Sequence, residues 1–174
     1  LAEKDYIIIG KDDPLITNPF IAKSFFGSTG MSYGAISKNA IRALAYGTAQ
    51  ANTWTNSGEG GLSSYHLEAG GQVIYQLGPS LFGSRNLDGS FSSEKFIANM
   101  SHPNVVACEI KFGQGAKVKG GHLPKEKLSK EIAELRGVPM GEDVESPNRN
   151  TEFCDTESFM EFLTYLKAIG CGKP

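Results

Sequence analysis

The chain has 174 residues, of which 40% are hydrophobic and 21% are charged, so it can bury one hydrophobic core and is neither disordered nor fibrous. Its net charge of -2 gives no overall basic field, which disfavours nucleic acid as the main partner. No apolar run approaches the length of a membrane span, and the first ten residues are too short and too acidic for a signal peptide.

Short strands, glycine loops and helices alternate in the first half of the chain. Residues 6–9 and 24–29 are predicted to be short strands, and a loop at 31–34 follows the second one. Ser37 is a credible N-cap for a helix over residues 37–51. The apolar face of that helix has helical spacing and is suited to packing on a sheet; it comprises Ile41, Leu44, Ala45 and Thr48.

The same alternation continues through the middle of the chain. Residues 52–55 are strand-like and lead into the glycine-rich loop 56–61. A further strand is predicted at 73–77 and a helix at 92–100. The next strand, at 105–111, runs into a second glycine-rich loop.

The strand at 105–111 is predicted to have two unlike faces, because successive side chains alternate across a strand. Its apolar face comprises Val106, Cys108 and Ile110. Its other face ends in charged residues and comprises Ala107, Glu109 and Lys111. A strand with charged residues at its carboxyl end, followed by glycines, is typical of active sites in parallel α/β sheets and barrels. The alternative is a solvated edge strand.

The last third of the chain contains two predicted helices. The first covers residues 125–136, and the polar stretch 140–151 that follows is predicted to be an irregular loop. The second covers 156–169 and is capped by Thr156 or Asp155; its apolar stripe comprises Phe159, Phe162, Leu163, Leu166 and Ile169. The alternation as a whole predicts parallel α/β architecture in one unit over residues 1–174. A closed eight-stranded barrel needs about 200 residues or more, so this length allows a half barrel or an open sheet.

Three strand ends carry polar residues between glycines, at 31–34, 56–61 and 111–121. Glycine lets a ligand approach the backbone, and exposed amide groups on such loops stabilise negative charge. None of the three matches a phosphate loop or a dinucleotide fingerprint. Ordinary turns are the alternative for each loop. Because the carboxyl ends of parallel strands lie at one edge, we expect Lys111 and the segments from Met31 and Asn56 to surround one hollow.

Five polar side chains near these strand ends are considered for that hollow. Lys111 and Lys117 flank Gln114, and such a lysine can neutralise an anionic cofactor ring or a substrate carboxylate, although most lysines are surface cations. Glu59 can accept a hydrogen bond from a substrate amine or stabilise an iminium; otherwise it is a loop carboxylate in water. Gln76 shares a strand face with Ile74 and can reach the same cavity, but a core amide is equally consistent with its position.

Cysteine and histidine positions argue against disulfides and metals. Cys108, Cys154 and Cys171 are odd in number and far apart, which predicts reduced thiols and a cytoplasmic location. The three histidines show no metal-ligand spacing with one another or with cysteine, so no metal site is predicted.

Several segments together resemble one known family. The sequences MSYGAIS at 31–37, NSGEGG at 56–61 and EIKFGQGAKVKGGHLP at 109–124 resemble the FMN-binding domain of glutamate synthase. Two further segments, at 75–91 and 131–143, are similar to the stand-alone FMN-binding glutamate synthase-like proteins. The resemblance covers nearly the whole chain in the right order.

This resemblance implies a (βα)8 barrel that holds FMN at its carboxyl mouth and makes glutamate from 2-oxoglutarate by way of 2-iminoglutarate. The residues it places along the cofactor are Met31, Ser32, Tyr33, Gly34 and Lys111, and we add Gln76 from its strand face. The residues it places at the 2-oxoacid substrate are Gln114, Lys117 and Glu59. Lys111 and Glu59 are the expected catalytic pair.

The chain departs from the family pattern in two loops. The family's AKPGEGG is AKVKGG here, so Val118 replaces the rigid proline and Lys119 adds charge to the loop. Leu62 stands where glutamate synthase has another glutamate after GEGG. The exact substrate is therefore open, and two alternatives remain: an N-methylglutamate-type transferase on a related barrel, and a non-catalytic scaffold subunit. The cysteines that hold the iron–sulfur cluster of the full synthase have no counterpart in this chain.

We also expect the sequence to be an excised piece, because it starts on Leu1 and stops just after a helix. Phosphate in such barrels is held by loops after the seventh and eighth strands, so the piece should bind FMN weakly or not at all. An open strand edge favours self-association. A glutaminase or electron-donor subunit is a possible partner of the whole enzyme.

Overall fold

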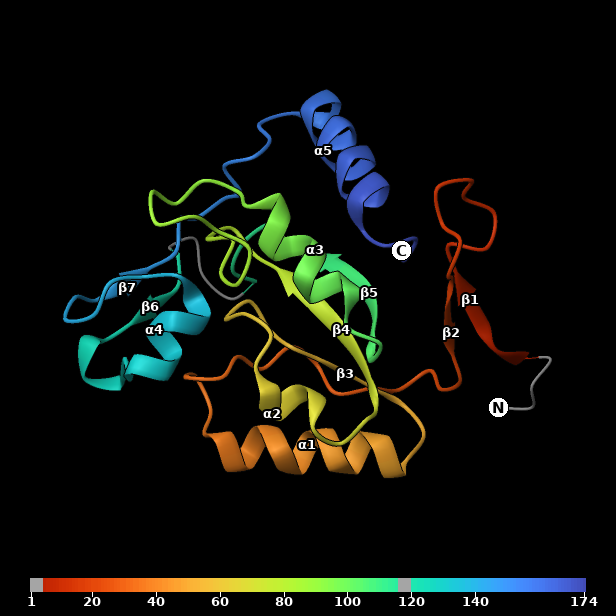
Figure 1. The fold of residues 1–174 in the computed structure, drawn as a ribbon, viewed down its shortest axis with the longest axis horizontal. Helices are drawn as coiled ribbons and strands as arrows, with labels where there is room; N and C mark the ends of the chain where they lie inside the picture. Colours follow the sequence, from red (N-terminus) through yellow and green to blue (C-terminus); the bar gives the residue numbers. More distant parts are fainter. Residues whose placement is uncertain (1–4, 116–119) are drawn as a thin grey trace.

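The computed structural model describes residues 5–115 and 120–174, and a parallel sheet lies at its centre (Figure 1). Strands β3 (Trp54–Asn56), β4 (Gln72–Leu77) and β5 (Val105–Ile110) follow one another in chain order and are parallel. Ser28 forms a single parallel bridge with Thr55 beside β3. Consecutive parallel strands joined through helices define an α/β fold, as the sequence predicts.

An antiparallel hairpin of β1 (Ile7–Ile9) and β2 (Phe20–Ala22) packs on the amino-terminal half of this sheet (Figure 1). Its buried residues, Phe20 and Ala22, cluster with Ile74 and Ala107. The sequence analysis missed β2 and wrongly placed a strand at 24–29. That segment forms only the Ser28 bridge to β3. Its two phenylalanines, which favour a buried strand, are exposed instead.

The main core lies between the other face of the sheet and two helices, α3 (Ser93–Ser101) and α5 (Thr156–Ile169) (Figure 1). Its largest buried members are Tyr75, Leu77, Phe96, Met100, Phe162 and Leu166. Asp155 is the N-cap of α5, because its carboxylate accepts from the Ser158 amide at 2.8 Å. The helices α1 (Lys38–Gln50) and α2 (Ser64–Leu67) contact each other and complete the layer, and Ser37 caps α1 as predicted. No described helix is both long enough and apolar enough to cross a membrane.

A register shift in β5 corrects one sequence inference about its faces. Val73 pairs with Val105, but Ile74 pairs with Ala107, so Val106 is an extra residue in the ladder. Cys108 and Ile110 pack on the helices, as predicted, whereas Val106 contacts the hairpin cluster on the opposite face. Strict alternation fails at Val106 because the irregularity turns its side chain to the inner face.

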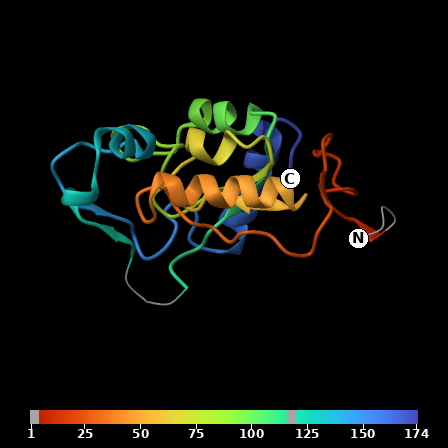
Figure 2. The same ribbon diagram turned by 90° about the horizontal axis from the view of Figure 1, so that it is seen from below.

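A second apolar cluster lies at the end of the molecule opposite the hairpin, as both ribbon views show (Figures 1 and 2). It joins α4 (Lys130–Arg136) and the short antiparallel pair β6 (His122–Leu123) and β7 (Val144–Glu145) to Tyr33 and Phe82. The predicted helix over 125–136 is divided. Residues Lys125–Lys127 form a 3-10 turn, and Ser129 caps α4 through a bond from the Ile132 amide.

Replacing Phe96 should test the main core. Phe96 is 1% exposed, so Phe96→Ala leaves a cavity and should lower the free energy of unfolding by about 3–5 kcal/mol in a urea titration followed by circular dichroism. Leu87→Ala is the matched control, because Leu87 is 84% exposed and should change stability little. Equal losses in the two variants would contradict the assignment of this core.

Candidate functional site

Three predicted site residues meet at the carboxyl edge of the parallel sheet. Glu59 comes from the loop after β3, and Lys111 and Gln114 follow β5. The Lys111 ammonium lies 3.2 Å from Glu59 Oε1 and 3.2 Å from Gln114 Oε1. The Gln114 amide in turn donates to Glu59 Oε1 at 2.7 Å. These three side chains therefore form a closed triangle of polar contacts, whereas Lys117 lies outside the described residues.

The second carboxylate oxygen of Glu59, Oε2, is buried. Among the described residues, no hydrogen-bond partner contacts Glu59 Oε2. Its position is tight, because a Cβ at Gly78 would lie 2.7 Å from that oxygen. Buried polar atoms in folded proteins nearly always have hydrogen-bond partners. This exception near the end of a strand favours a ligand group that donates a hydrogen bond to Glu59 Oε2.

Arg136 is a site residue that the sequence reasoning missed. It ends α4, is 6% exposed, donates to the Tyr33 carbonyl at 3.3 Å and has no described partner for its Nε. Burial lowers the pKa of Arg136, and the negative charge of Glu59 partly opposes that shift. The guanidinium carbon lies 5.0 Å from the Phe82 ring centre. The only sequence signal was its place in the 131–143 segment of the family resemblance.

Arg136 and Glu59 both line a cavity of about 290 Å³. Its polar lining comprises Ser32, Glu59, His122, Lys127, Arg136 and Ser146. A carboxylate or other small anion could contact Arg136 there while Lys111 and Arg136 together offset the charge of Glu59.

The segment 31–34 lies against this site, but its four residues play different parts. Ser32 and Gly34 line the cavity. The Tyr33 ring instead is buried in the second cluster, and its hydroxyl donates to Glu131 at 2.7 Å. Burial and the Glu131 carboxylate raise the pKa of Tyr33 to about 12. Tyr33 can thus meet a cofactor only through its backbone, and it stays neutral at physiological pH.

Gly58 allows the 31–34 segment and the 56–61 loop to touch. Gly58 has a φ of +66°, and a Cβ there would lie 2.5 Å from the Ser32 amide nitrogen. Only glycine combines that backbone conformation with so close an approach. The Met31 carbonyl on the same segment lies 3.5 Å from the buried His66 Nε2.

Deeper on the same face of the sheet lies a layer of amides around Glu109. The Gln76 amide and the Asn56 amide both donate to Glu109 Oε1, the second at 3.0 Å. Asn56 Oδ1 accepts from the Gly58 amide at 2.9 Å. Gln76 therefore contacts Glu109, and it is not among the residues that line the 290 Å³ cavity.

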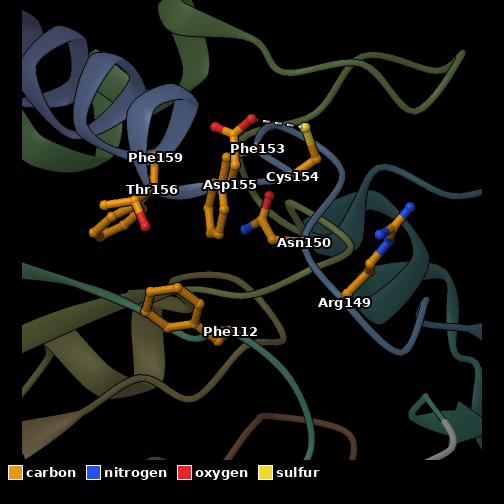
Figure 3. Close-up of a pocket in the computed structure, with 8 residues that line it drawn as sticks. All are labelled: Phe112, Arg149, Asn150, Phe153, Cys154, Asp155, Thr156 and Phe159. Carbon is orange, nitrogen blue, oxygen red and sulfur yellow. Dashed lines mark hydrogen bonds between the residues drawn. The ribbon is translucent and has the colours of Figure 1, made fainter.

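A larger cavity of about 430 Å³ opens beside the amino end of α5 and contains none of the predicted site residues (Figure 3). Its walls include the rings of Phe112, Phe153 and Phe159, while Arg149 extends away from them (Figure 3). Phe112 follows Lys111 directly and packs against the Phe153 and Phe159 rings. In residues 5–115 and 120–174, no three His, Cys, Asp or Glu side chains are placed to hold a metal ion.

The fold defines a parallel α/β protein with a cluster of charged and polar side chains at the carboxyl edge of its sheet. A family model described as the conserved region in glutamate synthase matches residues 6–174. The chain therefore belongs to the glutamate synthase family.

Curated relatives agree with this assignment over most of the chain. The glutamate synthase large subunit-like protein YerD of Bacillus subtilis (strain 168) is 42% identical over 153 residues, which cover 87% of this chain and 29% of YerD. The archaeal-type glutamate synthase (NADPH) of Dehalococcoides mccartyi is 37% identical over 138 residues, covering 79% of this chain and 25% of that protein. The archaeal glutamate synthase (NADPH) of Methanocaldococcus jannaschii is 35% identical over 138 residues, covering 79% and 24%. The chain thus spans about a quarter of the length of these relatives.

His66 should make stability depend on pH. Burial lowers the pKa of His66 to about 4, from about 6.5 in the unfolded chain, so the unfolded state binds more protons between those values. The stabilising effect of neutral His66 is present above pH 6.5 and is lost as the pH falls. Between pH 7 and pH 5 the wild type should lose roughly 2 kcal/mol more unfolding free energy than His66→Gln. Urea titrations at both pH values measure this difference, and identical losses would contradict it.

Proposed function

We propose that this chain is the first part of an FMN-binding (βα)8 barrel in a glutamate synthase-like oxidoreductase that reductively aminates 2-oxoglutarate. The observation that carries the proposal is the meeting of Glu59, Lys111, Gln114 and Arg136 at one edge of a parallel sheet. Strand order supports the barrel, because a bridge at Ser28 and then β3, β4 and β5 lie side by side in chain order. The family membership supports the chemistry.

The residues present fit a flavin at this edge. Lys111 supplies a cation at the end of β5, and Gly58 lets the 56–61 loop lie against the backbone of the 31–34 segment. A cation beside the pyrimidine edge of a flavin stabilises its reduced anion. When bound, FMN would supply the electrons for reduction of an imine. Met31, Ser32, Gly34, Gln76, Lys111 and the backbone of Tyr33 are the proposed cofactor contacts.

The charged cavity fits the 2-oxoacid. Arg136 can bind one carboxylate, and Gln114 together with Lys117 is proposed to hold the other end of the substrate. Glu59 Oε2 is buried and has no partner within residues 5–115 and 120–174, so it can accept a hydrogen bond from the nitrogen of an imine.

Replacing Lys111 tests the cofactor part of the proposal. In the full-length protein, Lys111→Met should weaken FMN binding about tenfold or more and lower the flavin reduction potential, because it removes the cation beside the reduced ring. Flavin absorbance and redox titration measure both effects. Lys130→Met is the matched control, since the Lys130 side chain is 84% exposed on α4. A colourless wild-type protein would contradict the flavoenzyme and favour a scaffold subunit.

Replacing Arg136 tests the substrate part. Arg136→Lys keeps the charge but not the paired donors, and Arg136→Gln removes both. We expect the KM for 2-oxoglutarate to rise about tenfold or more in Arg136→Gln and by less in Arg136→Lys, because a charge-assisted hydrogen bond contributes about 1.5–3 kcal/mol. Steady-state kinetics with ammonia and with methylamine measure this. An unchanged KM would contradict the role of Arg136, and preference for methylamine would indicate the N-methylglutamate-type transferase.

A further inference from the structure

The layer of Asn56, Gln76 and Glu109 on the inner face of the sheet has an unused acceptor. Lys111 and Glu59 lie beyond it at the carboxyl edge, and the hairpin cluster of Phe20, Ala22, Ile74 and Ala107 lies below it. Glu109 has no part in the function proposed above. Its carboxylate nevertheless accepts side-chain hydrogen bonds from Asn56 on β3 and from Gln76 on β4.

Glu109 fixes which way both amides point. An ionised carboxylate only accepts hydrogen bonds, whereas each amide has one donating end and one accepting end. The Asn56 and Gln76 nitrogens both donate to Glu109 Oε1, so each carbonyl oxygen must point away from it. For Asn56 that oxygen accepts from the Gly58 amide.

For Gln76 the carbonyl oxygen stays available. Among the described residues, no donor contacts Gln76 Oε1, and that oxygen is not one of the fully buried unpaired atoms. A Cβ at Gly30 would lie 3.1 Å from both Oε1 and Nε2 of Gln76, so the chain segment leading to Met31 lies against this amide. Gln76 as a whole is 9% exposed, and its backbone amide is held by Ser57 Oγ at 2.9 Å. The strand and Glu109 therefore hold the Gln76 carbonyl oxygen in one direction.

We propose that Glu109 is a positioning residue that holds the Gln76 carbonyl oxygen toward the cofactor, where it accepts the ring N–H of an imide such as the pyrimidine ring of a flavin. This inference rests on the proposed function. An imide N–H is flanked by two carbonyl groups, and Lys111 further along β5 offers a cation suited to one of them. A Gln76 amide turned the other way would place its own N–H₂ against the ring N–H.

A flavin methylated at N3 isolates this contact, because it lacks the N–H but keeps the rest of the ring. The experiment measures dissociation constants of FMN and 3-methyl-FMN for the full-length apoprotein by fluorescence quenching. The wild type should prefer FMN by about tenfold or more. Glu109→Gln lets the Gln76 amide adopt either orientation, so that preference should largely disappear. Glu161→Gln, an exposed replacement on α5, should keep it.

Gln76→Met provides a second measurement that leaves the carboxylate intact and removes the acceptor itself. Loss of the preference in both variants supports the inference. If either variant keeps the wild-type preference, or if Glu109→Gln weakens both flavins by the same factor, Glu109 has only a structural role and the inference is wrong. A wild-type protein that binds neither flavin would overturn the proposed function, and the inference with it. Circular dichroism establishes that the variants compared are folded.

Discussion

The ion pair between Lys111 and Glu59 is the contact on which the site depends. The two residues are 52 positions apart in sequence and meet because β3 and β5 end at the same edge of the sheet. Both side chains are mostly buried, with 27% and 17% exposed, so neither charge could be left alone without a large desolvation cost. Gln114 donates to the same Glu59 oxygen, and in the described part of the chain the other oxygen has no partner. The ion pair thus holds both charged groups in place through Glu59 Oε1, while Glu59 Oε2 can accept a hydrogen bond from a ligand.

Arg136 is positioned near Glu59 and Lys111 by the second apolar cluster rather than by the parallel sheet. The cluster of α4, β6 and β7 encloses Tyr33 and Phe82, so the 31–34 segment and the end of α4 are held by one apolar contact surface. Tyr33 contributes at both ends, because its hydroxyl contacts Glu131 and its carbonyl accepts from Arg136. Hydrophobic packing here sets the position of a buried cation, and the cation then contributes to the charge balance around Glu59.

The inner face of the sheet changes in character along the strands. Apolar residues of the hairpin cluster occupy its amino-terminal part, amides and Glu109 follow, and the ion pair lies at the carboxyl edge. Layers of side chains inside parallel barrels are arranged in this way, with chemistry confined to the carboxyl ends of the strands. After the extra residue at Val106 the pairing is regular, so plain alternation keeps Glu109 and Lys111 on the same face as Ala107.

The sequence by itself determined the local features: the α/β alternation, the helices at α1, α3 and α5, and the glycine loops that carry Glu59 and Lys111. These depend on periodicity and turn chemistry, which act between near neighbours. Only the tertiary structure decided the position of β2, the division of the 125–136 helix, the burial of the Tyr33 ring and the approach of Arg136 to Glu59. Each of these results from packing between segments far apart in the chain, and no local pattern encodes which distant surface a side chain will meet.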